Sequence, residues 1–236
     1  MIVYLDLETL PTNDPVLIER LGALIKAPAT HKKQETIDKW HEENGADALA
    51  KIVAETSFSG LYGRIACLAW MVDDEEVLAT DAADTEAQAI RKFYDFIQDY
   101  SRFGNSALTF CGHDIARFDL PFLKHRSIIL GIKPPPAIYK AMHAKPWDSC
   151  IADTKVMWTA DQWGHGSMDK LCYALGIPGK GDFDGSMVAE TWPRDPAKVI
   201  EYCKDDVRRT RKIYKRLTFS ETKHGNGTLL GAELEI

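Results

Sequence analysis

The sequence predicts an α/β domain in which a mixed sheet is flanked by helices, with a helical insertion after the first strand. Two observations support this class. Short apolar runs rich in β-branched and aromatic residues alternate with longer segments whose apolar residues follow helical spacing. In addition, 45% of the 236 residues are hydrophobic, which is enough for a substantial core. A chain of this length favours one sizeable domain.

The first half of the chain contains three predicted strands and one long helix. Residues 2–7 form a short apolar run that predicts a buried strand. The segments 65–72 and 77–80 predict the next two strands, and an acidic turn at 73–76 joins them. Helical spacing of apolar residues then predicts a helix over 84–100.

The second half combines one more strand with helices. Residues 107–111 predict a strand, and residues 117–130 predict a helix. A shorter helix is predicted over 168–175, where Gly176 is a typical stop. The last helix is predicted over 196–217, and Pro196 suits its first turn.

The first two predicted strands are separated by about sixty residues, far more than an ordinary loop needs. We therefore predict that residues 13–60 form a helical insertion, with amphipathic helices over 16–25 and 35–55. The insertion carries Lys26, His31, Lys32, Lys33 and Lys39. Residues 218–236 show little periodicity and are predicted to form a loosely held tail.

The composition excludes several classes of protein. No run of eighteen apolar residues exists, so no transmembrane helix and no membrane partner are expected. The N-terminus enters a strand directly, which leaves no room for a cleavable signal. Five scattered cysteines without a C-x-x-C pair indicate free thiols in a reducing, cytoplasmic environment. The net charge of −6 argues against binding nucleic acid by bulk electrostatics, although local basic patches can still hold a strand.

Acidic residues recur at positions that suit a metal site. Asp6 and Glu8 lie two apart on the first predicted strand, so their side chains point to the same face. Two carboxylates on a buried face are costly unless cations neutralise them. Asp119 follows the fourth predicted strand, while Tyr202 and Asp206 lie four apart on the last helix and are therefore neighbours.

Such a set of carboxylates predicts a specific chemistry. Mg²⁺ and Mn²⁺ prefer oxygen ligands and bind through a few carboxylates plus substrate phosphates. Two such ions about 3.5–4 Å apart can activate a water and stabilise the leaving oxygen of a phosphodiester. The sequence therefore predicts metal-dependent phosphodiester hydrolysis.

Three motifs in a fixed order carry a family resemblance. The first is D-x-E, at Asp6 and Glu8, and the third is Y-x-x-x-D, at Tyr202 and Asp206. The second is N-x-x-x-F-D, which appears as D-I-A-R-F-D at 114–119. The flanking G-H and L-P-F-L, and the later L-G-I-P-G-K and D-G-S, extend the similarity. Over roughly residues 1–217 the chain resembles the DEDD (DnaQ-like) 3′–5′ exonuclease superfamily, tyrosine subgroup, close to stand-alone relatives of the family-B DNA polymerase proofreading domain. The resemblance implies an RNase H-like fold.

The resemblance also implies a role for each motif residue, with two divalent cations, Mg²⁺ or Mn²⁺, as cofactors. Asp6 would bridge both ions. Glu8 and Asp206 would help to hold the ion that activates water, and Asp119 would support the second ion. Tyr202 would orient the attacking water. These five residues are the predicted catalytic set, and the four acids among them are the predicted metal ligands.

Three further residues are expected to contact the substrate. Leu10 and Phe118 would pack around the 3′-terminal nucleotide, since contacts with apolar side chains tolerate any base. Phe118 alternatively belongs to the core. Asp114 stands where the family often has Asn, and an ionised Asp only accepts hydrogen bonds. This difference would alter contacts near the second metal or the substrate backbone.

The expected function is therefore a 3′–5′ exonuclease that hydrolyses single-stranded DNA or frayed 3′ ends to nucleoside 5′-monophosphates. A 3′–5′ exoribonuclease is the nearest alternative, because no feature of the sequence reports on the 2′-hydroxyl. A catalytically idle fold that binds nucleic acid is a second alternative. A replication or repair protein is a candidate partner, and the oligomeric state stays open.

Four smaller features each have two interpretations. Cys111 and His113 are either a soft-metal pair or a buried cysteine near an unrelated histidine. His165 either contacts a phosphate or is a surface residue. The basic run at 208–216 is either a nucleic-acid patch or a solvated helix face. The 13–60 insertion is either a clamp on the substrate or a packed structural elaboration.

Overall fold

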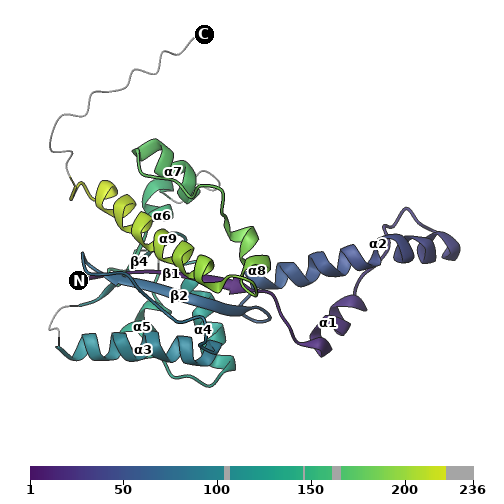
Figure 1. Cartoon of the computed structure of the whole chain (residues 1–236), viewed down its shortest axis with the longest axis horizontal. Coiled ribbons are helices and arrows are strands. Elements are labelled where there is room, and N and C mark those ends of the chain that lie inside the picture. Colours follow the sequence, from purple (N-terminus) through teal and green to yellow (C-terminus); the bar gives the residue numbers. More distant parts are fainter. Residues whose placement is uncertain (104–106, 146, 161–165, 222–236) are drawn as a thin grey trace, which may run out of the picture.

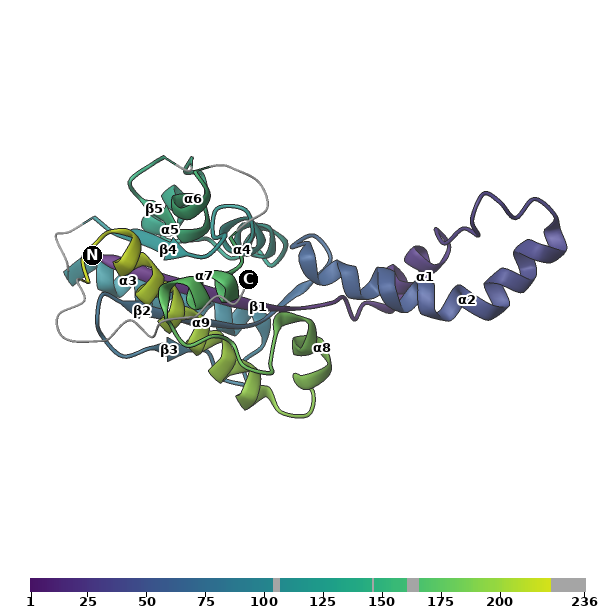
Figure 2. The same cartoon turned by 90° about the horizontal axis from the view of Figure 1, so that it is seen from above.

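The computed structural model describes residues 1–103, 107–145, 147–160 and 166–221. Figures 1 and 2 show a sheet covered by helices and a helical arm that projects from one end of this body. Most of the predicted tail, residues 222–236, lies outside the described residues. Among the described helices, none is long and apolar enough to cross a membrane.

Five strands in the described part of the chain form one sheet, in the order β3-β2-β1-β4-β5. Their bounds are β1 (Ile2–Leu10), β2 (Arg64–Val72), β3 (Leu78–Ala79), β4 (Thr109–Gly112) and β5 (Ile151–Asp153). β2 pairs antiparallel with β1 and with β3, whereas β4 pairs parallel with β1 and with β5. The mixed sheet that the sequence predicts is therefore confirmed, and β1 is its central strand.

Alternation along β1 sends successive side chains to opposite faces of the sheet. Leu5 and Leu7 pack into the larger core, which includes residues of α3 (Glu86–Phe103), α4 (Asp119–Ile129) and α5 (Pro136–Ala141). These helices lie on one side of the sheet in Figure 1.

The other face of the sheet is covered by α9 (Pro196–Leu217) and α8 (Val188–Thr191). Tyr4 of β1 belongs to the smaller core on this face, together with Val199 and Cys203 of α9, and its ring lies 5.9 Å from the ring of Tyr214. The acids of β1 alternate with its leucines, so they face this helix rather than the larger core.

The remaining elements are short. α6 (Thr154–Thr159) and α7 (Met168–Leu175) both contact α9, and η2 (Gly185–Met187) leads into α8. Sequence analysis missed β5, α5, α6 and α8. Each has six residues or fewer, which is too short for an apolar periodicity to show.

The predicted insertion forms the arm, with α1 (Pro15–Gly22), α2 (Gln34–Glu55) and the single turn η1 (Thr56–Phe58). The two predicted helices are present and contact each other. Neither contains a buried residue. The expectation that α2 is amphipathic is therefore wrong, because it projects from the body and has no apolar face to bury. The choice between a clamp on the substrate and a packed structural elaboration stays open.

Candidate active site

The central strand carries Asp6 and Glu8 past the point where its parallel neighbour ends. The register of β1 with β4 runs from Ile2 to Tyr4, whereas its register with β2 continues to Leu10. Asp6 and Glu8 therefore lie beyond the carboxyl end of β4, at the edge of an α/β sheet where ligands bind. Both residues are partly buried.

A tight turn leads from β4 to α4 and positions Asp119. Gly112 has no room for a side chain, since a Cβ there would lie 2.6 Å from the Cβ of Ile115. Asp114 adopts a φ of 74°, which Asn and Asp tolerate better than most residues. The Asp153 carboxylate accepts hydrogen bonds from the backbone N–H of Asp114 (3.0 Å) and of the second residue after it (3.1 Å). The turn thus holds Asp119, which is 3% exposed, in the first turn of α4.

Helix α9 brings Tyr202 and Asp206 to the same region. Its first turn is fixed by Pro196 and by the side chain of Asp195, which accepts a hydrogen bond from the N–H of Lys198 (3.1 Å). The helix packs across β1 and β2. Tyr202 and Asp206 lie one turn apart and are 7% and 3% exposed.

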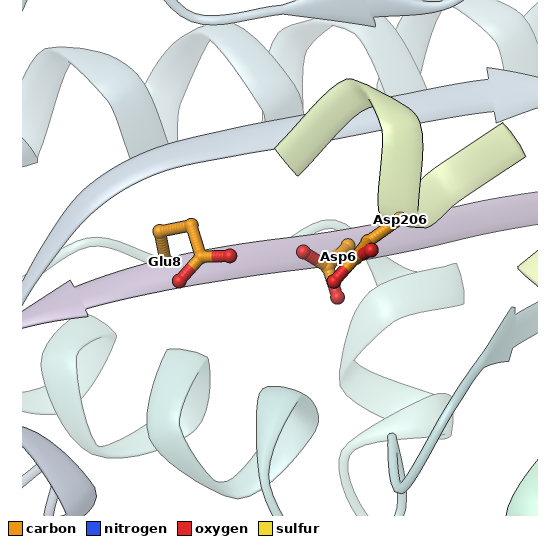
Figure 3. A group of neighbouring side chains, drawn as sticks. All are labelled: Asp6, Glu8 and Asp206. Atoms are coloured by element: carbon orange, nitrogen blue, oxygen red, sulfur yellow. The ribbon is translucent and has the colours of Figure 1, made fainter. Parts of the chain in front are cut away.

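Three of the four predicted metal ligands meet. One carboxylate oxygen each from Asp6, Glu8 and Asp206 lies within 4.8 Å of the others, and Figure 3 shows these side chains converging from β1 and α9. Asp119 lies outside this group, but its negative charge helps to raise the pKa of Asp6 and of Glu8. The donor set consists of hard carboxylate oxygens, which fits Mg²⁺ or Mn²⁺.

Burial and mutual repulsion set the protonation of these acids. Burial, followed by the charge of Asp206, raises the pKa of Glu8 to about 8 and that of Asp6 well above its usual range. Burial also raises the pKa of Asp119 to about 8, and the charge of Asp153 adds to the effect. The cluster therefore favours either bound protons or bound cations at neutral pH.

Two cations of the protein itself contact Asp206. The Lys180 ammonium donates to Asp206 Oδ2 (2.5 Å) and to the Tyr202 hydroxyl oxygen (2.7 Å). Arg209 donates to Asp206 Oδ1 (2.7 Å) and to the backbone carbonyl of Gly179 (3.0 Å). Burial alone would lower the pKa of Lys180, but the charges of Asp206 and Tyr202 outweigh it and raise that pKa.

Sequence analysis gave Lys180 no role and considered Arg209 only as part of the basic run at 208–216. The available signal for Lys180 was its place in the L-G-I-P-G-K segment, which was noted only as part of the resemblance. Cys203 was also missed, although its thiol lies 3.4 Å from Asp6 Oδ2 and donates to it. The contacts of Lys180 and Cys203 join segments that are far apart in the sequence, so no local pattern predicts them, whereas Arg209 lies only three residues from Asp206 on the same helix.

The residues predicted to contact substrate have different surroundings. Leu10 is 6% exposed and lies in the smaller core, so it offers little surface to a nucleotide. Phe118 is partly buried and packs against Phe122, with ring centroids 5.7 Å apart. Asp114 accepts a hydrogen bond from the Lys155 ammonium at 2.6 Å. The substrate contacts of these residues stay predictions.

The two interpretations of Cys111 and His113 can now be separated. Cys111 is fully buried. Both ring nitrogens of His113 are engaged, Nδ1 with Thr154 Oγ1 (2.9 Å) and Nε2 with the carbonyl of Gly166 (2.6 Å). These contacts favour a structural role over a soft-metal pair. His165 lies outside the described residues.

The basic run on α9 is largely engaged within the protein. Arg208 pairs with two acids of the same helix, at 2.6 Å each. Arg211 and Lys215 both pair with Asp74. These ion pairs favour a solvated helix face over a nucleic-acid patch.

Comparison with known proteins shows the family of the chain. Residues 64–228 match the model of a family described as "Predicted 3′-5′ exonuclease related to the exonuclease domain of PolB", and the match spans more than half of the chain. The chain belongs to this family. The matched region of this chain contains Asp119, Tyr202 and Asp206, while Asp6 and Glu8 precede it.

The fold is similar to that of a solved family B DNA polymerase from the hyperthermophilic archaeon Pyrobaculum calidifontis, with a TM-score of 0.56 and 18% sequence identity. The superposition covers 92% of this chain and 24% of the polymerase chain, so this chain spans about a quarter of that protein's length. The predicted RNase H-like fold is confirmed. No curated protein matches the sequence.

Proposed function

We propose that the protein is a 3′–5′ exonuclease of the tyrosine subgroup, which uses two divalent cations, Mg²⁺ or Mn²⁺. Its substrate is single-stranded DNA or a frayed 3′ end, and its products are nucleoside 5′-monophosphates. The observation that carries the proposal is the convergence of Asp6, Glu8 and Asp206 within 4.8 Å, beside a tyrosine one helical turn from Asp206. Family membership supports the same activity.

The acids of β1, α4 and α9 are assigned to the cations. Asp6, Glu8 and Asp206 contribute the close group of oxygens, and Asp119, at the start of α4, would help to hold the second ion. When bound, such a pair of ions supplies a nucleophile at neutral pH and stabilises the leaving oxygen of a phosphodiester. Their charge also offsets the repulsion that raises the pKa of Glu8.

Tyr202 orients the attacking water in this mechanism. Lys180 donates a hydrogen bond to the Tyr202 oxygen, so the phenolic O–H is free to donate in turn. The hydroxyl is therefore fixed in direction before the substrate binds. Burial, followed by the charge of Asp206, raises the pKa of Tyr202, which keeps its proton in place at neutral pH.

Lys180 adds a positive charge next to the reacting phosphate, where negative charge accumulates in the transition state. Arg209 holds the other oxygen of Asp206 and so fixes the orientation of that carboxylate. Both cations are 22% exposed or less at the side chain, which strengthens their electrostatic effect.

Residues 1–217 form the exonuclease domain in this proposal, with 13–60 inserted as the arm and 218–236 as a tail. The relation of the family to the exonuclease domain of PolB favours DNA over RNA. Five buried free cysteines among the described residues suit a reducing compartment such as the cytoplasm. A replication or repair protein is the proposed partner class, since proofreading by this chain would act on ends that another enzyme produces.

The decisive experiment compares labelled single-stranded DNA, RNA and 3′-recessed duplexes with Mg²⁺, Mn²⁺ or a chelator. We expect mononucleotide release from free 3′ ends of DNA, loss of activity with the chelator, and strong slowing by a 3′-phosphate. Cleavage of circular single-stranded DNA would reveal an endonuclease. A preference for RNA, or binding without hydrolysis, would favour one of the two alternatives.

The double variant Asp6→Ala/Glu8→Ala tests the site itself. Turnover should fall by several orders of magnitude, because the acids hold the metals that perform the chemistry. Asp95→Ala/Asp99→Ala, on α3 at the other face of the sheet, is the matched control and should keep full activity. Equal DNA degradation by wild type and by Asp6→Ala/Glu8→Ala would refute the assignment.

A further inference from the structure

The root of the arm displays three large apolar side chains on one turn. Phe58, Leu61 and Tyr62 are 75%, 58% and 42% exposed, and they fall within five successive residues. Apolar residues scattered singly over a surface are normal, but a group of them marks an interaction site. We therefore expect this turn to bind another molecule.

The backbone of this turn is closely packed around two glycines. A Cβ on Gly63 would lie 2.6 Å from the Thr56 carbonyl, and one on Gly60 would lie 3.0 Å from the Cβ of His125. Arg126 donates a hydrogen bond to the carbonyl of Gly60 (3.4 Å). The backbone packs tightly against α4 through its glycines, while its largest side chains face solvent.

The turn lies at the end of β1, the strand that carries two of the candidate catalytic acids. β1 contains Asp6 and Glu8. Figure 2 shows this strand leading into the arm. Thr9, the residue after Glu8, donates from its hydroxyl to the carbonyl of Ser57 (2.8 Å). A second contact joins the backbone N–H of Thr12 to Thr56 Oγ1 (2.8 Å). A strand whose 3′ end lies at the carboxylates meets this turn if it leaves along β1.

Beyond the turn, one segment of the arm is basic, although acidic residues outnumber lysines and arginines over the arm as a whole. Between Glu19 and Glu35 the sequence contains no acidic residue. The basic side chains of this segment are Arg20, Lys26, His31, Lys32 and Lys33. In an otherwise acidic protein, this local excess is complementary to a phosphate backbone.

We propose that Phe58, Leu61 and Tyr62 form a stacking surface for the bases of a single strand, upstream of the nucleotide at the catalytic acids. Apolar and aromatic platforms of this kind accept any sequence, because every base has a π-face. The basic side chains of residues 20–33 contact the phosphates of the same strand. This inference rests on the proposed function, and it names the part of the protein that holds the substrate during hydrolysis.

Equilibrium binding tests the surface without catalysis. A 5′-fluorescein oligothymidylate is titrated with wild type, Phe58→Ser and Tyr62→Ser in a chelator, and anisotropy is measured. Each substitution should weaken binding by about 5- to 100-fold. Tyr139→Ser, which removes a 58% exposed tyrosine from α5, is the matched control and should bind like wild type. Thermal melting verifies that the variants stay folded.

Photocrosslinking tests direct contact. A single 5-iododeoxyuridine is moved along the oligonucleotide from its 3′ end, and the crosslinked peptides are mapped. We expect crosslinks to the peptide that contains Phe58 and Tyr62 from positions near the 3′ end, and none from the distant 5′ end. Hydrolysis of the nitrophenyl ester of thymidine 5′-monophosphate should be unchanged in both variants, because it is too short to reach the turn.

The outcomes separate this inference from the proposed function. If wild type hydrolyses DNA while both variants bind it with wild-type affinity and no crosslink forms, the stacking surface is refuted, and the turn serves another partner class such as a protein. If binding depends on Phe58 and Tyr62 but no hydrolysis occurs, the surface stands and the catalytic proposal falls.

Discussion

The ammonium group of Lys180 lies between Tyr202 and Asp206, within hydrogen-bonding distance of both. This positive charge stabilises the acid cluster. It also competes with a bound metal ion for Asp206, which is a predicted metal ligand. Lys180 therefore has two opposing effects on the Asp206 carboxylate. Loss of the charge should help metal binding and harm the chemistry.

Lys180→Met separates these effects. We expect turnover to fall by about 10- to 1,000-fold, the range for removal of one group that stabilises developing charge. Mn²⁺ affinity of the free protein, measured by calorimetry, should rise because Asp206 loses a competing cation. Lys198→Met, at an exposed position near the start of α9, is the control and should change neither. Weaker Mn²⁺ binding by Lys180→Met would contradict the competition.

Tyr202→Phe tests whether the hydroxyl acts on the water or on the metals. Turnover should fall by about 10- to 1,000-fold, because one positioned hydrogen-bonding group contributes about 2–4 kcal/mol to transition-state stabilisation. Calorimetric Mn²⁺ affinity should stay at the wild-type value. A collapse of that affinity would instead make Tyr202 part of the metal site.

Asp114 shows how the structure accommodates a departure from the family's usual Asn. Its carboxylate is paired with Lys155 at 2.6 Å, and the residue holds the left-handed conformation that the turn requires. The extra negative charge is therefore balanced by a neighbour across the turn. This pairing explains why an ionised Asp fits beside an acidic site.

At the scale of elements, the arm is the feature that ordinary folding requirements do not explain. Its two helices bury no residue, so they contribute little to the core and must be held at the root by η1 and the neighbouring turn. Its basic segment, residues 20–33, follows the strand that carries the acids of β1. The role in holding the substrate that we propose would account for both properties.

The double variant Lys32→Gln/Lys33→Gln tests whether the basic tip of the arm, within residues 20–33, contacts DNA. Binding to single-stranded DNA should weaken, and the log–log salt slope should become shallower by about 0.7 for each lost phosphate contact. Hydrolysis of the nitrophenyl ester of thymidine 5′-monophosphate should not change. Lys133→Gln/Lys140→Gln, two exposed lysines in and beside α5, is the control with equal charge loss. An unchanged salt slope in the tip variant would show that the arm tip does not contact DNA.

At the scale of the whole molecule, the acid cluster couples stability to pH. Glu8 and Asp119 each have a pKa of about 8 in the folded protein, above their usual values, so the folded state binds protons more tightly than the unfolded chain. Their contribution to stability is complete below about pH 4 and is lost as pH rises to about 8.

Urea denaturation in a chelator should therefore show a falling free energy of unfolding between about pH 5 and 8. Each carboxyl group contributes at most about 1.4 kcal/mol per pH unit in this window. Glu8→Gln should flatten the slope. Saturating Mn²⁺ should reverse it, because metal binding requires deprotonated ligands. A stability that rises with pH in the chelator would contradict the repulsion within the cluster.

Much of the candidate site was readable from the sequence because its motifs are local. The spacing of Asp6 and Glu8 on a strand, and of Tyr202 and Asp206 on a helix, places each pair on one face through backbone geometry alone. The mixed sheet followed from apolar runs of the right length. By contrast, the short elements β5 and α6 left no periodic signal, although Asp153 between them organises the turn before Asp119.

The sequence by itself determined the fold class, the order of the main strands and helices, and the pairs of residues that share a face. These depend on backbone periodicity, which acts over a few neighbouring residues. Only the tertiary structure decided that Lys180 and Arg209 hold Asp206, that Asp114 is paired with Lys155, and that the insertion stands away from the body. Arg209 lies only three residues after Asp206, but the contacts of Lys180 and Lys155 join residues far apart along the chain, so packing of the whole molecule sets them.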